Sequence, residues 1–424
     1  MTAAEPGGAD ETAEVGARQV ELLLEPRDGL PPLVASAAEL DVATAALGAG
    51  TGPVAVDAER ASGFRYGHRA FLVQFRRRGA GTVLIDPVAC PDLSGIDAAL
   101  TGTEAVLHAA SQDLPCLADL GYRPRELFDT EIAGRLLGCP RVGLATMVEL
   151  MLGLGLEKTH SAADWSTRPL PVDWLRYAAL DVEVLVELRD VLAHELTEQG
   201  KIEWARQEFA AILAAAAQPQ QPRADPWRRT SGIHRIHTRR GLAVVRELWL
   251  ERDKIARRRD LSPTKVLVDT AIVEAARVIP SGPEELTAIT GFTARGARRH
   301  LPEWLRAISR AKSMPDRALP PASAPPGEGP PPAHRWPDRD PEAAQRLTAA
   351  RAVVAALADS HNLPAENLLP PDAVRRLSWQ PPATLSAEAV GADLTSYGAR
   401  PWQVELTSMP LARAMMRILE KGSE

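Results

Sequence analysis

Short apolar runs alternate with helical segments over the first half of the chain. The runs are rich in valine, leucine, isoleucine and phenylalanine and end at polar residues, which is typical of buried strands. A helical period follows Ser36, whose side chain is suited to an N-cap, and continues through Leu47. Strands interleaved with helices predict a mixed α/β domain. The predicted strands are Val54–Val56, Ala70–Phe75, Thr82–Asp86 and Ala105–His108.

The helical period dominates the second half. Apolar residues recur on one face between Gly241 and Arg259, which predicts an amphipathic helix. Ser262 and Pro263 form a cap followed by proline at the first helical position, so we expect a second helix from there to about Val278. Further helices are expected from Pro283 and around Trp304.

Composition divides the chain into segments. The N-terminal residues are too poor in large apolar side chains to offset the entropy of ordering. Gln-Pro repeats and a dense proline tract are typical of linkers. Leu363–Leu369 loosely repeats Leu261–Leu267, which predicts a divergent second copy of the helical domain. The expected organisation is a disordered tail (1–20), an α/β domain (21–217), a linker (218–232), a helical domain (233–312), a proline-rich linker (313–338) and the second helical domain (339–424).

Overall composition restricts the class of protein. The chain has 424 residues, of which 45% are hydrophobic and 25% charged, as in globular proteins. Its three cysteines, Cys90, Cys116 and Cys139, lack the spacing of a zinc site, and we expect unpaired thiols in a reducing compartment. The sequence shows no secretion signal and no apolar stretch long enough to span a membrane. We therefore expect a cytoplasmic protein.

The charge distribution is uneven. The net charge is −6, yet the segment from Arg223 to Lys312 contains 20 Lys and Arg against 10 Asp and Glu. A basic segment between acidic ones indicates contact with nucleic acid. The alternative is that these charges only solvate the exposed faces of helices.

Four carboxylates, three of them at or after predicted strands, are the candidate functional groups. Asp57 and Glu59 are two residues apart on a predicted strand, so their side chains share one face. Asp113 follows another strand, at the edge where ligand sites concentrate in open α/β sheets. Tyr177 and Asp181 are four residues apart on a predicted helix and emerge on one face. Hard divalent cations prefer oxygen ligands, so the four carboxylates predict a metal site.

Each of these features also has a purely structural interpretation. Solvated acids at a strand end explain Asp57 and Glu59 taken alone, and a core tyrosine beside an edge aspartate explains Tyr177 and Asp181. Asp129 precedes a helical run and is interpreted as its N-cap, not as a metal ligand. The chain contains no complete dinucleotide fingerprint and no phosphate-binding Gly-Lys-Ser/Thr loop, so ATP-driven chemistry is not indicated.

The three acidic segments together resemble the DEDD exonucleases of the tyrosine-bearing subtype. Asp57-Ala-Glu59 is similar to the first motif, His108-x4-Asp113 to the second and Tyr177-x3-Asp181 to the third. The intervening sequence and the three-domain order resemble the bacterial ribonuclease D family, with the basic helical segment similar to an HRDC domain. The resemblance implies a ribonuclease H-like α/β exonuclease domain followed by all-α helical domains. Ala58 departs from the family, in which a hydroxyl residue is common there.

The resemblance implies a reaction and a ligand set. Asp57, Glu59, Asp113 and Asp181 would hold two divalent ions, Mg²⁺ or Mn²⁺, and Tyr177 would orient or help deprotonate the attacking water. The product would be a 5′-nucleoside monophosphate from the 3′ end of structured RNA, such as a tRNA precursor. Rival interpretations are a DNA 3′-5′ exonuclease and a non-catalytic nucleic-acid-binding protein, and a monomer is expected. The candidate substrate contacts are His108, Lys158 and Arg168, and structural charges explain Lys158 and Arg168 equally well.

Overall fold

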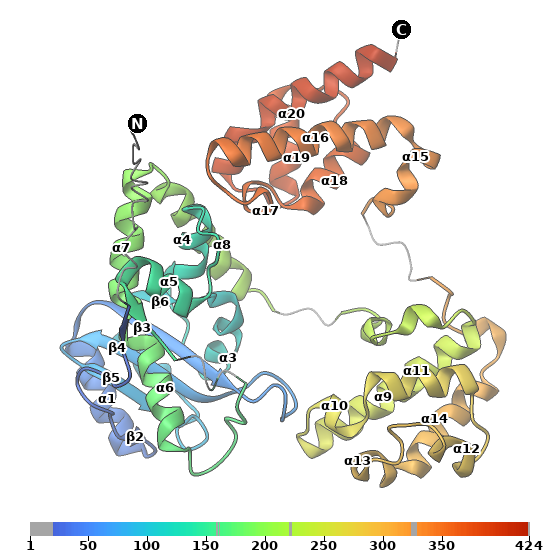
Figure 1. Cartoon of the computed structure of the whole chain (residues 1–424), viewed down its shortest axis with the longest axis horizontal. Helices are drawn as coiled ribbons and strands as arrows, with labels where there is room; N and C mark the ends of the chain where they lie inside the picture. Colours follow the sequence, from blue (N-terminus) through green and yellow to red (C-terminus); the bar gives the residue numbers. More distant parts are fainter. Residues whose placement is uncertain (1–19, 158–159, 161, 220–222, 324–328, 423–424) are drawn as a thin grey trace, which may run out of the picture.

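The computed structural model describes residues 20–157, 160, 162–219, 223–323 and 329–422. These residues form three lobes: an α/β domain, a first helical unit (226–319) and a C-terminal helical unit (333–422) (Figure 1). The α/β domain followed by helical units agrees with the architecture expected from the sequence. The disordered tail predicted at the N-terminus falls almost wholly outside the described residues.

A six-stranded mixed sheet with the order β2-β5-β4-β3-β6-β7 is the centre of the α/β domain. β3 is antiparallel to β4 and parallel to β6, and its residues Val54, Ala55 and Val56 are fully inaccessible to solvent. Such an apolar run is required because helices cover both faces of the sheet. A short second sheet pairs β1 with β8. The strands are β1 Glu21–Leu22, β2 Leu33–Val34, β3 Thr51–Arg60, β4 Ala70–Arg78, β5 Gly81–Ile85, β6 Glu104–Leu107, β7 Glu126–Asp129 and β8 Leu154–Gly155.

Helices pack around this sheet, and α1 begins where the sequence predicts. Ser36 caps α1 by accepting a hydrogen bond from the Glu39 amide, as expected. The apolar face of α7, including Leu188, Leu192 and Leu196, is fully buried in the main core. The helices of this domain are α1 Ala37–Ala49, α2 Ser94–Ala99, α3 Leu114–Asp119, α4 Thr130–Leu136, α5 Leu144–Leu152, α6 Val172–Glu183, α7 Leu185–Glu198 and α8 Ile202–Ala216, with a 3-10 turn η1 at Ala110–Gln112.

The first helical unit has its own apolar core around Trp304. The single helix expected from Pro263 to Val278 is wrong, because Leu267 and Val268 are extended and divide it into two helices. The unit also extends beyond its expected bounds, since Trp227 and Leu319 from the two predicted linkers are buried in this core. Its helices are α9 Arg239–Arg259, α10 Pro263–Val266, α11 Asp269–Val278, α12 Pro283–Thr287, α13 Arg295–Arg298 and α14 Leu301–Ser313, with 3-10 turns at Pro226–Arg229, Ile233–Arg235 and Asp316–Ala318.

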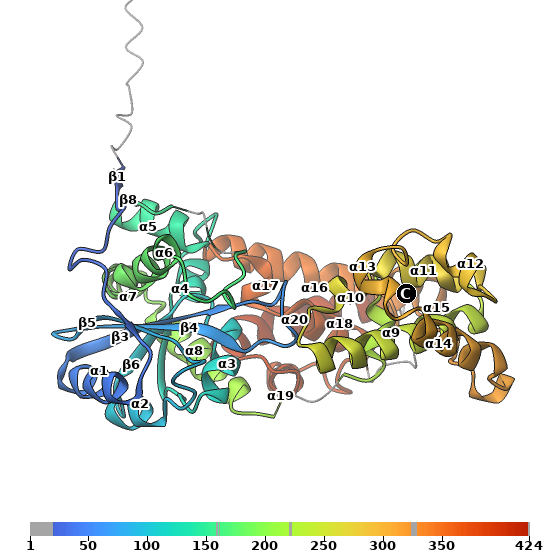
Figure 2. The same cartoon turned by 90° about the horizontal axis from the view of Figure 1, so that it is seen from below.

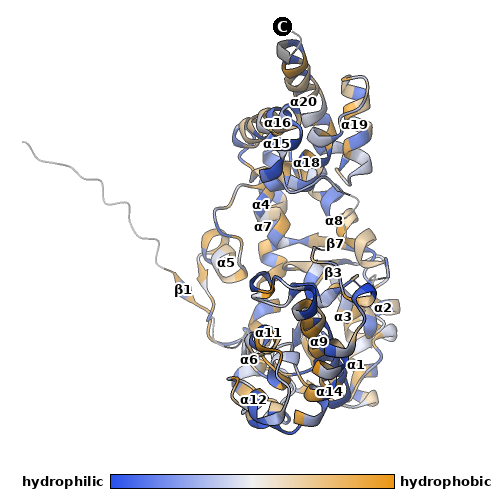
Figure 3. Ribbon diagram, turned by 90° about the vertical axis from the view of Figure 1, so that its right-hand side faces the viewer, coloured by the Kyte–Doolittle hydropathy of each residue, from blue (hydrophilic) through white to orange (hydrophobic). Residues whose placement is uncertain are grey.

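The C-terminal unit shares part of its helix order with the first helical unit. In each unit a long helix, capped by Thr238 in one and by Asp340 in the other, is followed by a one-turn helix beginning near Pro263 or Ala365. Figure 3 shows hydrophilic and hydrophobic residues mixed along α16, α19 and α20. The elements are a 3-10 turn at Ala333–Arg335, then α15 Trp336–Arg339, α16 Pro341–Ser360, α17 Ala365–Leu368, α18 Pro371–Trp379, α19 Ala387–Ser396 and α20 Pro401–Gly422.

Both helical units contact the α/β domain. In the C-terminal unit, the Trp402 indole stacks on Trp204 of α8, with ring centroids 4.8 Å apart, and donates a hydrogen bond to Glu208 at 3.0 Å. In the first helical unit, Asp253 accepts a 2.9 Å hydrogen bond from the Tyr66 hydroxyl, which lies in the loop between β3 and β4. Figure 2 shows the β3–β4 end of the sheet directed towards α9 and α10. The strand that carries Asp57 thus leads directly into a contact between domains.

None of the helices in the described part of the chain is both long and apolar enough to cross a membrane.

Candidate active site

Three carboxylates converge beside the central strand. Asp57 and Glu59 extend from β3, and Asp181 extends from α6, which packs against that strand. Each offers an oxygen atom, and these oxygens all lie within 4.8 Å of one another. Residues two apart on a strand point to the same face, so β3 presents Asp57 and Glu59 together, and α6 presents Asp181 opposite them. The structure thereby brings together groups that are more than 120 residues apart in the sequence.

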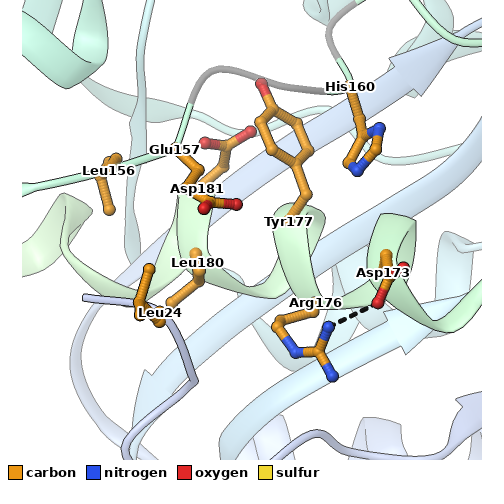
Figure 4. Close-up of a pocket in the computed structure, with 9 residues that line it drawn as sticks. All are labelled: Leu24, Leu156, Glu157, His160, Asp173, Arg176, Tyr177, Leu180 and Asp181. Carbon is orange, nitrogen blue, oxygen red and sulfur yellow. Dashed lines mark hydrogen bonds and ion pairs between the residues drawn. The ribbon is translucent and has the colours of Figure 1, made fainter. Parts of the chain in front are cut away.

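The helix α6 presents Tyr177 on the same side as Asp181. Both project into a pocket that Glu157 also lines (Figure 4). The other side of the helix is anchored in the core, where Ala178, Ala179 and Val182 are fully buried. The i, i+4 spacing places the phenol one turn from the carboxylate, as expected from the sequence.

Asp113 reaches the same cleft from a loop after β6. It directly precedes the short helix α3 and is 5% exposed, and its Oδ1 lies 3.1 Å from a terminal nitrogen of Arg60. The loop requires a left-handed backbone at Ala109, with φ of 57°. Asp129 stabilises this turn by accepting hydrogen bonds from the Ala109 and Ala110 amides at 3.1 and 2.8 Å. The position of Asp113 therefore depends on a buried carboxylate from the neighbouring strand.

Asp129 is the N-cap of α4, as the sequence predicts. One of its oxygens accepts hydrogen bonds from the Glu131 and Ile132 amides at 2.9 and 3.3 Å. Together with the two alanine amides, these donors satisfy both oxygens of a carboxylate that is 1% exposed. A carboxylate satisfied in this way is a structural group and not a metal ligand.

The electrostatics of the cluster favour neutral carboxyl groups when no cation is present. Burial raises the pKa of Asp113 to about 8, and the negative charge of Asp57 adds to the increase. Burial, followed by repulsion from Asp57 and Asp181, raises the pKa of Glu59 well above its usual value. The pKa of Asp181 is likewise raised, first by burial and then by Asp57. Opposing positive charge would stabilise the ionised form of all these groups.

The residues fit divalent cations. Their donors are carboxylate oxygens, which Mg²⁺ and Mn²⁺ prefer, and they surround a cleft of about 450 Å³. The clustered acids repel one another, and a cation removes that cost. Among the cleft residues that the structure describes, Arg60 is the only lysine or arginine, so the protein itself supplies little compensating charge.

The three substrate contacts expected from the sequence differ in where the structure places them. His108 lines the cleft, its Nδ1 lies 2.9 Å from the Thr130 hydroxyl, and burial lowers its pKa to about 4, so its ring is neutral near pH 7. Lys158 lies outside the described residues. The Arg168 guanidinium pairs with both oxygens of Asp86 and donates to three backbone carbonyl groups. All five of its N–H donors are used in holding the fold, so the structural interpretation of Arg168 is the correct one.

Several residues that line the cleft were not identified as candidates from the sequence. They include Arg60, Gln112, Glu157 and the turn from Gly143 to Thr146 at the start of α5. A basic residue directly after Glu59 was a usable signal for Arg60. The others have no distinguishing local pattern.

Family models match the chain in three segments. A model described as a 3′-5′ exonuclease covers residues 33–197, and an HRDC domain model covers residues 241–308. A model described as a 3′ to 5′ exonuclease C-terminal domain covers residues 329–415. Fold and site thus define the class of protein: a 3′-5′ exonuclease with an appended HRDC domain.

Sequence relatives identify the family. The chain is 31% identical over 277 residues to ribonuclease D of Gluconacetobacter diazotrophicus, an alignment that covers 63% of this chain and 68% of the relative. The chain belongs to the ribonuclease D family. Alignments to two other curated ribonucleases D cover less of the relative, namely 55% of the Acidiphilium cryptum protein and 65% of the Escherichia coli protein.

Solved structures extend the similarity to nearly the whole chain. A crystal structure of a protein from Bifidobacterium adolescentis matches with a TM-score of 0.85 and 38% identity, over 94% of this chain and 100% of that one. Escherichia coli RNase D, described as an exoribonuclease involved in structured RNA processing, matches with a TM-score of 0.66 and 25% identity, over 92% of this chain and 98% of that one. The likeness therefore includes both helical units as well as the exonuclease domain.

Proposed function

We propose that this protein is a 3′-5′ exoribonuclease that removes nucleotides one at a time from RNA 3′ ends and releases 5′-nucleoside monophosphates. The observation that carries the proposal is the convergence of Asp57, Glu59, Asp113 and Asp181 with Tyr177 on one cleft. Family membership supports the same reaction.

The four carboxylates would hold two divalent ions, which supply activation of water and stabilisation of the leaving oxygen when bound. Asp57, Glu59 and Asp181, whose oxygens all lie within 4.8 Å of one another, would form the centre of this ligand set. Burial and the neighbouring carboxylates raise the pKa of Tyr177, so its phenol stays protonated near neutral pH. This supports orientation of the attacking water by a hydrogen bond over direct removal of its proton. Mg²⁺ and Mn²⁺ both suit the all-oxygen donor set.

Structured RNA, such as a tRNA precursor, is the proposed substrate. The description of the Escherichia coli relative supports this choice, and the excess of positive charge between Arg223 and Lys312 supports contacts with the RNA backbone. We propose a monomer in the cytoplasm. The three unpaired cysteines support the reducing compartment.

Matched 3′-labelled RNA and DNA, each incubated with Mg²⁺, Mn²⁺ or EDTA, test the proposal. We expect stepwise shortening of RNA with either metal, no reaction in EDTA and slower shortening of DNA. Asp57→Asn, with its unchanged shape and lost charge, is the matched inactive control. Preferential shortening of DNA would favour the rival DNA exonuclease, and binding without any hydrolysis would favour a non-catalytic binding protein.

A further inference from the structure

Arg60 occupies an unusual place for a cation, inside the acidic cleft. One terminal nitrogen donates to the backbone carbonyl of Gln112, and the other lies 3.1 Å from Asp113 Oδ1. The Arg60 side chain is 24% exposed, so it faces the open cleft while its partner Asp113 is nearly buried. A proposed metal ligand is thus paired with an internal guanidinium in this structure.

The backbone of β3 is shaped to direct Arg60 into the cleft. Neighbouring residues on a regular strand point to opposite faces, so Arg60 would normally point away from Glu59. The pairing with β4 is irregular at this point: Glu59 lies opposite Leu72, whereas Arg60 lies opposite Ala70. Such an irregularity re-aims side chains and is common beside active sites. Both Glu59 and Arg60 consequently line the same cleft.

The acidic lining of the cleft indicates a role for the Arg60 side chain. Five carboxylates line the cleft, namely Asp57, Glu59, Asp113, Glu157 and Asp181, and Arg60 is the one permanent cation among the described residues that line it. A guanidinium keeps its charge at any physiological pH and its planar fork matches a phosphate group. The same fork can therefore hold the Asp113 carboxyl group before catalysis and bind a phosphate afterwards.

We propose that Arg60 is an exchangeable partner of Asp113: its guanidinium holds the Asp113 carboxyl group in the empty site, releases it when divalent ions enter, and then binds the phosphate of the terminal nucleotide. The bond to the Gln112 carbonyl anchors one side of the guanidinium while the other side changes partner. This inference rests on the proposed function and adds a residue that selects for phosphate in the same cleft.

Binding measurements on the full-length protein test the pairing with Asp113 and the phosphate contact separately. The first titrates Mn²⁺ alone into metal-free protein, and the second titrates adenosine 5′-monophosphate into protein saturated with Mn²⁺. We expect Arg60→Gln to bind Mn²⁺ roughly tenfold more tightly, because a competing unit charge has left the site. The same variant should bind the monophosphate roughly tenfold or more weakly, because a charge-assisted hydrogen bond is lost. If Arg60 had a purely structural role, the affinities for Mn²⁺ and for the monophosphate would not change in opposite directions.

Two further variants make the result decisive. Arg60→Lys retains the charge without the fork, so its Mn²⁺ affinity should stay close to that of the wild type while its monophosphate affinity falls. Arg78→Gln makes the same charge change at an exposed position at the opposite end of the β3–β4 pair and should alter neither isotherm. Unchanged or weaker Mn²⁺ binding by Arg60→Gln would overturn the role of Arg60 in the empty site, and unchanged monophosphate binding would overturn the phosphate contact. Wild-type protein that binds both probes yet cleaves no RNA would refute the proposed function and still leave the role of Arg60 decided by the isotherms.

Discussion

Replacing Asp113 with asparagine should stabilise the metal-free protein while abolishing catalysis. In the folded state burial raises the pKa of this carboxyl group to about 8, whereas an exposed aspartate in the unfolded chain titrates near 4. The unfolded state therefore loses its proton between pH 4 and pH 8 while the folded state keeps it. A raised carboxyl pKa means that stability is lost as the pH rises through this window.

The size of the stability loss follows from the distance between the working pH and the pKa of Asp113 in the unfolded chain. At pH 7 the unfolded group lies about three pH units above its pKa, and each unit corresponds to about 1.4 kcal/mol, so the folded protein loses up to about 4 kcal/mol. Asparagine cannot ionise, and the variant avoids this loss. For a cooperative unit of 150–250 residues, the gain corresponds to a rise in melting temperature of as much as roughly 8–16 °C.

Thermal melts in EDTA at pH 4.5 and pH 7.5 measure the effect. Asp113→Asn should melt above the wild type at pH 7.5 and close to it at pH 4.5, where both side chains are neutral in the fold. Adding Mn²⁺ at pH 7.5 should raise the melting temperature of the wild type more than that of the variant, because ligand binding stabilises the folded state in proportion to affinity. The exposed Asp41 of α1, replaced by asparagine, is the control and should change stability by less than about 0.5 kcal/mol. A variant that is no more stable than the wild type at pH 7.5 in EDTA would refute the electrostatic account of the cleft.

Three further outcomes are expected. Tyr177→Phe should lower the single-turnover rate by roughly 10²-fold at unchanged substrate affinity and melting temperature, and a full-speed but less stable enzyme would mean that the phenol is only a core group. Trp402→Ala removes the stack on Trp204 and should weaken docking of the C-terminal unit by about 3–5 kcal/mol, seen as faster proteolytic release of that unit, and an unchanged cleavage rate would contradict the contact. Removing everything after Ala217 should weaken RNA binding and flatten its salt dependence, because fewer phosphate contacts release fewer counterions, whereas an unchanged slope would show that the arginines are only surface charge.

Local patterns predicted the elements that carry the chemistry. The strand containing Asp57, the helix containing Tyr177 and the N-cap role of Asp129 all follow from interactions within a few residues of chain. The extended break at Leu267 and Val268 was missed because the break divides a continuous helical period without a glycine or proline. Trp227 and Leu319 were placed in linkers because proline and glutamine surround them, although their side chains complete an apolar core.

The sequence by itself predicted the α/β order, the helical units and a candidate set of four acidic residues with a tyrosine, because residue type, spacing and strand or helix period are properties of short segments. Only the tertiary structure decided how these groups are used. Sheet order brings Asp181 within reach of β3, an irregular pairing turns Arg60 towards Asp113, and the partners of Arg168 come from segments about 82 and 97 residues away. Such contacts depend on which distant surfaces pack together, and a local pattern contains no information about which side chain will meet a carboxylate and which will meet a phosphate.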